Sequence, residues 1–230
     1  MIAIVPARGG SKGLLRKNLL ILKDKPLIAH TIESALKAKC INEVIVTTDD
    51  IEITQVAKDY GASVPFRRPD YLATDTASAM DVYIHAIEWL NNTRQLNISK
   101  FMVLLPTTPL RTSDDIEKAY ELFMKERATT LVAVREAEIP PNWYMDIDSN
   151  LRLKPCMFGG EGHLTNRQEN KRYVIVCGAV YILDYQLLKD KRTYYSDNTV
   201  AFIMPKDKSV DIDCKEDFEY AKFLMNSVSD

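Results

Sequence analysis

Residues 1–18 read MIAIVPARGGSKGLLRKN, a short apolar run that leads into a basic, glycine-rich segment. Ile2 to Val5 have the composition of a buried strand in a parallel sheet, and Pro6 ends that strand. Glycines at 9, 10 and 13 allow backbone N–H groups to approach an anion, and four cations among residues 8–17 neutralise its charge. The stretch therefore predicts a site for nucleotide phosphates, with a tight turn carrying exposed cations as the alternative.

This glycine-rich loop matches neither of the common phosphate-binding fingerprints, GxxxxGKS/T and GxGxxG. Arg8 presents a planar fork of donors and Lys12 a point charge, so the two side chains suit a clamp on a triphosphate. In open α/β sheets ligands bind where parallel strands end. Arg8, Asp49 and Thr107 all follow expected strands and fall at such ends.

The overall composition is that of a globular protein. The 230 residues are 46% hydrophobic, enough for a sizeable core, and we expect one domain over residues 1–230. The formal net charge of -2 gives no sign of a nucleic-acid surface, so local clusters must carry any anion binding. The four cysteines lie far apart without a CxxC pair, which argues against a disulfide framework or a zinc site.

No stretch of the sequence indicates a membrane or an export signal. No apolar run approaches the roughly 18 residues of a spanning helix. The first residues lack the charged start and the long apolar core of a signal peptide. We therefore expect a soluble, cytoplasmic protein with no membrane partner.

Short apolar runs alternate with amphipathic segments through the first 134 residues. This alternation predicts an α/β fold, a mostly parallel twisted sheet with helices on both faces. The expected helices begin near residues 26, 51, 78 and 116. The expected strands are 2–5, 43–47, 101–105 and 130–134, with shorter candidates at 19–22 and 64–66.

The alternation breaks between residues 139 and 172, where prolines and glycines interrupt any helix. We interpret 139–172 as a segment inserted into the domain, with a small β element of its own. Beyond it we expect a long buried strand at 174–183 broken at Gly178, a short strand at 201–204 and a closing helix at 216–225.

Asp211 and Asp213 form a candidate metal site. Residues i and i+2 of an extended chain point the same way, so the two carboxylates converge. Mg²⁺ is commonly held by one or two carboxylates together with phosphate oxygens. The alternative is a polar turn that caps the last helix, and the pair alone favours that reading.

Three further segments carry polar side chains suited to binding, and each has a plainer alternative. Residues 75–78, with Arg68 upstream, suit a flat base or simply cap a helix. Residues 105–111, LPTTPLR, suit the floor of a sugar pocket or form a plain loop. Arg167 suits a substrate carboxylate as a bidentate fork or is a solvated surface charge.

Seven stretches together carry a family resemblance. They are, in chain order, IVPARGGSKGLLRKN, VTTDD, RRPDYLATDTAS, LLPTTPLR, NRQENKRY, GAVYI and VDID. In this order and spacing the chain resembles the acylneuraminate cytidylyltransferases, or CMP-sialic acid synthetases, over nearly its whole length. The resemblance implies the nucleotidyltransferase fold, which is similar to that of glycosyltransferase A enzymes.

The resemblance also implies a role for each matching residue. The catalytic residues it implies are Arg8, Lys12 and Lys17, and the ligands of an Mg²⁺ cofactor are Asp211 and Asp213. The nucleotide-binding residues it implies are Arg8, Gly9, Gly10, Ser11, Lys12, Asn18, Arg68, Ala77 and Ser78. The sugar-binding residues it implies are Leu105, Thr107, Thr108, Arg111, Arg167, Gln168 and Tyr173.

The activity implied by the resemblance joins CTP to a sialic-acid-like nonulosonic acid, giving a CMP-sugar and pyrophosphate. Family members are homodimers in which a segment like 139–172 reaches into the neighbouring subunit. The family usually has Gln at the position of Leu105 and Asn at the position of Cys177. Because both positions lie near the sugar in the family, legionaminic or pseudaminic acid stays open beside N-acetylneuraminic acid.

Two rival functions stay open at this point. One is an enzyme of the same fold that uses another nucleotide or sugar, such as GTP or 3-deoxy-octulosonate. The other is a catalytically silent subunit that binds a nucleotide or sugar. Leu105 and Cys177 keep the second rival open, whereas the intact Arg8, Lys12 and the two aspartates argue against it.

Overall fold

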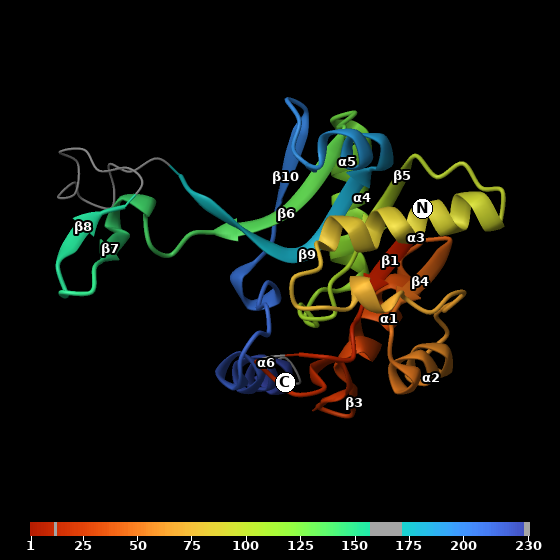
Figure 1. Cartoon of the computed structure of the whole chain (residues 1–230), viewed down its shortest axis with the longest axis horizontal. Helices are drawn as coiled ribbons and strands as arrows, with labels where there is room; N and C mark the ends of the chain where they lie inside the picture. Colours follow the sequence, from red (N-terminus) through yellow and green to blue (C-terminus); the bar gives the residue numbers. More distant parts are fainter. Residues whose placement is uncertain (12, 157–171, 228–230) are drawn as a thin grey trace.

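The computed structural model describes residues 1–11, 13–156 and 172–227 (Figure 1). Among these residues, the central sheet has six strands in the order β10-β6-β9-β5-β1-β4. The strands are β1 (Ile2–Pro6), β4 (Glu43–Thr47), β5 (Lys100–Val103), β6 (Thr130–Glu136), β9 (Val174–Asp184) and β10 (Thr199–Ile203).

The pairing of these strands is mostly parallel. β1 runs parallel to β4 and to β5, and β10 runs parallel to β6. β9 lies between β5 and β6 and is antiparallel to both. The predicted α/β class with a mostly parallel sheet is therefore confirmed, with β9 as the exception. The chain leaves the sheet at the end of β6 and returns at the same edge to begin β9, so β9 runs in the opposite direction to β6.

Helices cover both faces of the sheet, as predicted. Ala3 and Val5 of β1 pack in one core cluster with Ile32 of α1, whereas Ile4 packs in another with Ile87 of α3. Alternate residues of a strand face opposite sides, so these two clusters are the two faces. The helices of the first face are α1 (Leu27–Lys37), α2 (Ile51–Asp59) and α4 (Ser113–Lys125), and those of the second are α3 (Ala79–Thr93) and α5 (Tyr185–Lys191).

A third, smaller cluster attaches the end of the chain. Leu22 and Leu27 pack with Ile212 and Ala221, and all four are buried. This contact joins the last helix, α6 (Lys215–Ser227), to the hairpin of β2 (Ile21–Leu22) and β3 (Lys25–Pro26). The segment just before α6, which carries the two candidate metal aspartates, is thereby brought beside the N-terminal part of the chain.

An arm projects from the sheet in Figure 1. β6 and β9 pair out to Glu136 and Val174, and beyond them lies the hairpin of β7 (Met145–Ile147) and β8 (Leu153–Pro155). The small β element expected within 139–172 is therefore present in its described part, and residues 157–171 lie outside the described residues. The short 3-10 helices are η1 (Lys17–Leu19), η2 (Asp70–Leu72), η3 (Pro141–Trp143) and η5 (Lys206–Lys208).

Some of the elements predicted from the sequence differ in the structure. The strand expected at 64–66 is absent, and only isolated bridges occur at Ser63 and Arg67, because Pro65 has no N–H to donate to a ladder. Helix α4 begins at Ser113 rather than Ile116, because Thr112 and Asp115 form a capping box ahead of the apolar face. Helix α5 was missed, since seven residues leave little periodicity to read.

The strand expected to break at Gly178 continues through it. Gly178 has φ 72°, and a β carbon built there would lie 2.9 Å from Leu105 Cδ1. The β6–β9 register shifts between Val132 and Val134, near this glycine. Only the inner part of the strand is buried, because Val174 to Val176 are 40–44% exposed on the arm.

Among the described residues, no helix is both long enough and apolar enough to cross a membrane.

Candidate active site

The ends of three parallel strands meet at one edge of the sheet. Beyond β1, the N–H of Ala7 donates to the carbonyl of Thr47 at 3.0 Å. Beyond β5, the N–H of Leu104 donates to the carbonyl of Ile4 at 3.1 Å. The glycine-rich loop, the 48–50 segment and the 105–108 segment therefore start side by side, as the placement of Arg8, Asp49 and Thr107 at strand ends predicted.

A cavity of about 400 Å³ opens at this edge. The loop supplies one wall of the cavity, the segment after β5 a second, and the residues before α6 a third. Segments more than 190 residues apart in the sequence thus share one cavity. The lining residues are Pro6, Arg8, Ser11, Gly13, Lys17, Asn18, Leu105, Pro106, Thr107 and Asp213.

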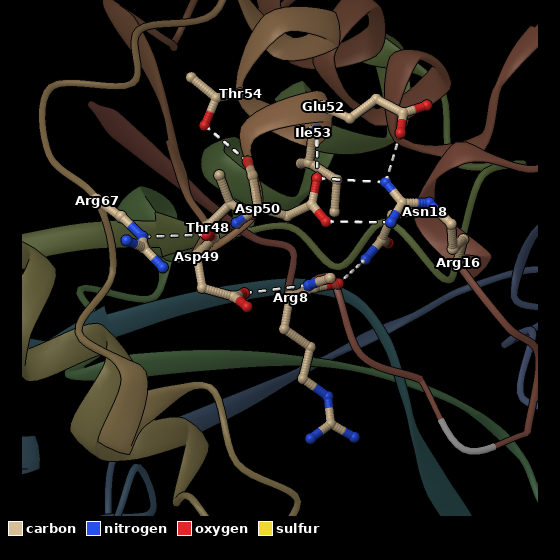
Figure 2. Close-up of polar contacts among 11 residues, drawn as sticks. Arg8, Arg16, Asn18, Thr48, Asp49, Asp50, Glu52, Ile53, Thr54 and Arg67 are labelled. Carbon is tan, nitrogen blue, oxygen red and sulfur yellow. Dashed lines mark hydrogen bonds and ion pairs between the residues drawn. The ribbon is translucent and has the colours of Figure 1, made fainter.

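The start of the loop is held by polar contacts that Figure 2 shows. The N–H of Gly9 donates to Asp49 Oδ1 at 3.0 Å. The side-chain amide of Asn18, which is buried, donates to the carbonyl of Arg8 at 3.0 Å. In Figure 2 the guanidinium of Arg8 points away from this network. It forms an ion pair with Asp75 at 2.8 Å, which links the loop to the 75–78 segment.

The end of the loop contacts Ile212 and Asp213, in the segment before α6. Lys17 Nζ donates to the carbonyl of Ile212 at 2.6 Å and to Asp213 Oδ1 at 3.0 Å. A β carbon built on Gly13 would lie 2.2 Å from the carbonyl oxygen of Asp213. Glycine is therefore required at 13 for the loop to approach this segment. The sequence pattern predicted the same role, approach to an anion, for all three glycines of the loop. Lys12 lies outside the described residues.

Asp211 carries a buried carboxylate oxygen, Oδ1, without a hydrogen-bond partner. Burial raises the pKa of Asp211 above its ordinary value, and the negative charge of Asp213 adds to this, although Thr107 and Lys17 oppose it. An unsatisfied buried oxygen beside a second carboxylate suits a cation.

A magnesium ion here would use few protein ligands. Among the described residues, no group of three or more His, Cys, Asp or Glu side chains could hold a metal. Mg²⁺ is commonly bound through one or two carboxylates with phosphates and waters completing its shell. Asp211 and Asp213 fit that pattern, although Asp213 is paired with Lys17 in this structure.

The segment expected to bind the base has internal contacts of its own. Arg68 is buried, and its guanidinium donates to the side chain and the carbonyl of Thr47. Burial lowers the pKa of Arg68 to about 10, whereas the charge of Asp49 raises it. Ser78 caps α3 by accepting a hydrogen bond from the N–H of Met80 at 3.2 Å. Helix capping was the alternative to base binding for this segment. Base binding by this segment stays a prediction.

Ala77 and Ser78 line a second cavity of about 420 Å³, along the start of α3. Neither residue lines the cavity that the glycine-rich loop forms. Arg8 lines the first cavity, and its ion-pair partner Asp75 lies in the chain between Thr74 and Thr76, which line the second. The structure therefore brings the phosphate loop and the 75–78 segment together through Arg8.

Two of the four expected sugar residues after β5 lie behind the cavity wall. Arg111 is 2% exposed and donates to Ala179 O at 2.7 Å and to Thr31 Oγ1 at 2.9 Å. Thr108 is fully buried and bonds to the carbonyls of Leu105 and Gly178. Arg111 and Thr108 thus support the segment from behind, and their burial argues against the direct sugar contact expected of them.

Of the remaining expected sugar residues, only Tyr173 is among the described ones, and it does not line the cavity. Tyr173 lies at the base of the arm, where its carbonyl accepts from the N–H of Ala137 at 3.0 Å. Its side chain is 39% exposed and does not line the cavity. Arg167 and Gln168 lie outside the described residues.

Sequence reasoning missed the side chains that hold the loop from the α2 side. Asp50 caps α2 and forms an ion pair with Arg16, whose Nη1 lies 3.3 Å from Asp50 Oδ2. The signal for Asp50 was its place between a strand and a helix, because aspartate is a favoured N-cap residue. No pattern in the sequence indicated that Arg16 is its partner.

We expect Gly13→Ala to weaken CTP binding by about tenfold, on the order of 1.4 kcal/mol. The added methyl group would collide with the backbone of Asp213, so the loop must move away from the aspartates. Leu15→Ala is the control in the same loop, because Leu15 is 80% exposed and does not line the cavity. Isothermal titration calorimetry with CTP compares the two variants. Equal affinity in both would contradict the close packing of the loop on the aspartates.

The comparisons with known proteins agree on the family. The family model described as cytidylyltransferase matches residues 2–224. A CMP-N,N'-diacetyllegionaminic acid synthase from Legionella pneumophila is 36% identical over 229 residues, 98% of this chain and 96% of that protein. A pseudaminic acid cytidylyltransferase from Campylobacter jejuni is 33% identical over 223 residues, 97% of this chain and 95% of that protein.

An N-acylneuraminate cytidylyltransferase from Escherichia coli is 36% identical over 222 residues, which are 96% of this chain and 51% of that protein. Among solved structures, a CMP:2-keto-3-deoxy-manno-octonic acid synthetase complexed with CTP has a TM-score of 0.70 at 18% identity. That likeness covers 99% of this chain and 98% of the other, and it shows the nucleotidyltransferase fold. The predicted resemblance is confirmed, and the chain belongs to the cytidylyltransferase family of nucleotidyltransferases.

Proposed function

We propose that this enzyme transfers the CMP group of CTP to a nonulosonic acid and releases pyrophosphate. The relatives at 32–36% identity that span nearly the whole chain are named for legionaminic, pseudaminic and N-acylneuraminic acids. The observation that carries the proposal is the cavity in which the basic loop faces the Asp211–Asp213 segment across Lys17. CTP as substrate agrees with the cytoplasmic location expected from the sequence.

The reaction forms one phosphorus–oxygen bond and breaks another. The anomeric hydroxyl of the acid attacks the α-phosphorus of CTP, loses its proton, and the bond to the β-phosphate oxygen breaks as pyrophosphate leaves. Catalysis of such a transfer depends mainly on positioning and charge stabilisation. Arg8 and Lys17, both at the cavity, would stabilise the charge on the phosphates, with Lys12 from the same loop.

Asp211 and Asp213 would hold Mg²⁺, because the buried Oδ1 of Asp211 lacks a partner. When bound, the ion would neutralise phosphate charge and favour loss of the hydroxyl proton. Thr107 favours the charged form of the Asp211 carboxylate and so opposes the rise in its pKa. The carbonyl of Thr107 in turn accepts from the N–H of Ile212 at 2.8 Å, so the aspartates are fixed to the segment after β5.

The two departures from the family pattern occupy different places. Leu105 lines the cavity, so it presents an apolar side chain where the family usually has an amide. Cys177 is 2% exposed and belongs to the core cluster, and burial raises the pKa of its thiol. Of the two, Leu105 is the one placed to contact a substrate. We therefore propose the substrate class, a nonulosonic acid, and the substituents of the acid are to be determined by experiment.

We also propose that two copies of the chain associate through the arm. Single exposed apolar residues are normal, whereas a contiguous group marks an interaction surface. A second copy is the occupant we infer, since the arm leaves its apolar side chains 39–78% exposed. These side chains are Ile139, Trp143, Tyr144, Met145, Ile147, Leu151, Leu153, Tyr173, Val174, Ile175 and Val176.

Pyrophosphate release with CTP, Mg²⁺ and a panel of nonulosonic acids tests the reaction. We expect turnover with at least one acid and none when GTP replaces CTP. The panel includes 3-deoxy-octulosonate, because an octulosonate enzyme of the same fold is the rival. Turnover with 3-deoxy-octulosonate alone would replace the proposed substrate class. CTP binding without turnover on any acid would favour a silent binding subunit.

We expect Asp211→Asn to lower turnover by orders of magnitude and to raise the melting temperature of the ligand-free protein. The raised pKa of Asp211 means that the folded protein binds this proton more tightly than the unfolded chain, so ionisation at neutral pH costs stability. Asparagine removes that cost. Thermal unfolding at pH 7 with and without Mg²⁺ checks the stability, since only the wild type should gain stability from the ion, and pyrophosphate release measures the turnover. Near-native turnover in Mg²⁺ would contradict the metal assignment.

We expect Ile147→Asp with Leu153→Lys to convert a dimer into a monomer with little loss of stability. The two residues pair across β7 and β8 and are each 63% exposed, so the opposite charges would support the hairpin while charged groups replace the apolar side chains that face the partner. Light scattering after size exclusion measures the mass. Met124→Asp on α4 is the control, because Met124 is 55% exposed away from the arm. A dimer that survives the double change would place the interface elsewhere.

A further inference from the structure

One carboxylate, that of Asp50, contacts both ends of the glycine-rich loop (Figure 2). At the start of the loop, a β carbon built on Gly9 would lie 2.6 Å from Asp50 Oδ2, so the carboxylate occupies the space beside this glycine. At the end of the loop, Arg16 Nη1 lies 3.3 Å from Asp50 Oδ2, and Nη2 donates to Oδ1 at 3.4 Å. Gly9 and Arg16, near the two ends of the loop, thus both lie next to Asp50.

The position of Asp50 is itself fixed by the fold. It is the N-cap of α2, and its Oδ1 accepts from the N–H of Ile53 at 3.0 Å. Its own N–H donates to Thr48 Oγ1 at 3.1 Å, and its carbonyl accepts from Thr54 Oγ1 at 2.9 Å. Its side chain is 16% exposed. Asp50 is therefore a rigid point between β4 and α2, against which a loop can be placed.

The partner residue Arg16 adopts an unusual backbone conformation. Its φ of 53° lies in the left-handed region, which costs a non-glycine residue free energy. Arg16 is the residue before η1, so its conformation sets the direction of Lys17 and Asn18. Lys17 then reaches Asp213, and Asn18 reaches the carbonyl of Arg8. The ion pair with Asp50 holds Arg16 where both contacts form.

We infer that Asp50 is a positioning residue for the CTP phosphates, acting through Arg16 and the space beside Gly9; the inference deepens the proposed function. Asp50 does not line the cavity, so it has no direct contact with a ligand there. Its effect is on the loop, which carries cations and backbone N–H groups that the phosphates require. Loss of the Asp50–Arg16 pair would release Arg16 from its left-handed conformation and move Lys17 away from Asp213.

Asp50→Asn tests this inference, because asparagine is as good an N-cap as aspartate and has almost the same size. We expect the melting temperature to stay near that of the wild type. We expect the Kd for CTP, measured by isothermal titration calorimetry, to rise about tenfold because Arg16 has lost its charged partner. The KM for the sugar, where turnover is observed, should stay within about twofold, whereas a general distortion of the site would weaken the binding of both substrates.

Two further variants distinguish the effect of the Asp50–Arg16 ion pair from that of other charges near Arg16. Arg16→Gln should weaken CTP binding as much as Asp50→Asn, and the double variant should be no weaker than either single one. Glu52→Gln is the matched control: Glu52 also pairs with Arg16, at 2.7 Å, but its side chain is 67% exposed and Gly9 is not its neighbour. We expect its affinity for CTP to stay within about twofold of the wild type.

The inference is overturned if Asp50→Asn binds CTP like the wild type, or if the two single changes add in the double variant. A loss in Glu52→Gln equal to that in Asp50→Asn would also overturn it, since any acid near Arg16 would then serve. CTP binding is measured without a sugar. Failure of every acid to react would therefore overturn the proposed reaction while this result stood.

Discussion

The ammonium group of Lys17 joins the two ends of the chain. It donates to the carbonyl of Ile212 and to the carboxylate of Asp213, residues 195 and 196 positions away. Neither partner reaches this place through the sheet, because both belong to the segment before α6. They are held there by the third core cluster, in which Ile212 packs with Leu22 and Leu27. The cavity exists because this small cluster brings a C-terminal segment against an N-terminal loop.

Two buried arginines stiffen the scaffold around that cavity. Arg68 and Arg111 are 4% and 2% exposed, and neither forms an ion pair with a carboxylate among the described residues. Hydrogen bonds to carbonyl and hydroxyl oxygens offset the cost of burying each charge. Arg68 bonds to Thr47 at the end of β4, and Arg111 bonds to Ala179 in β9. Each guanidinium thus fixes a strand where the site begins.

The sequence predicted the scaffold better than the roles of single side chains. Apolar runs such as 43–47 decide the strands, and the parallel pairing then places Arg8, Asp49 and Thr107 at one edge. By contrast, no sequence pattern indicates that a charged residue is buried in the fold. In the sequence Arg111 ends a polar, hydroxyl-rich loop, and only the fold shows that β9 and α1 enclose it. The i, i+2 spacing placed Asp211 and Asp213 together, but could not show that Lys17 pairs with the second.

Carboxylates of the chain itself contact the groups of the loop that we propose for phosphate binding. Asp75 pairs with Arg8, Asp49 accepts from the N–H of Gly9, and Asp213 pairs with Lys17. These contacts balance part of the positive charge of the basic loop within the chain itself. A triphosphate that binds there exchanges one anionic partner for another, so part of its interaction energy replaces contacts already present. Affinity then depends on how well the loop fits the phosphates, which is a matter of geometry more than of charge alone.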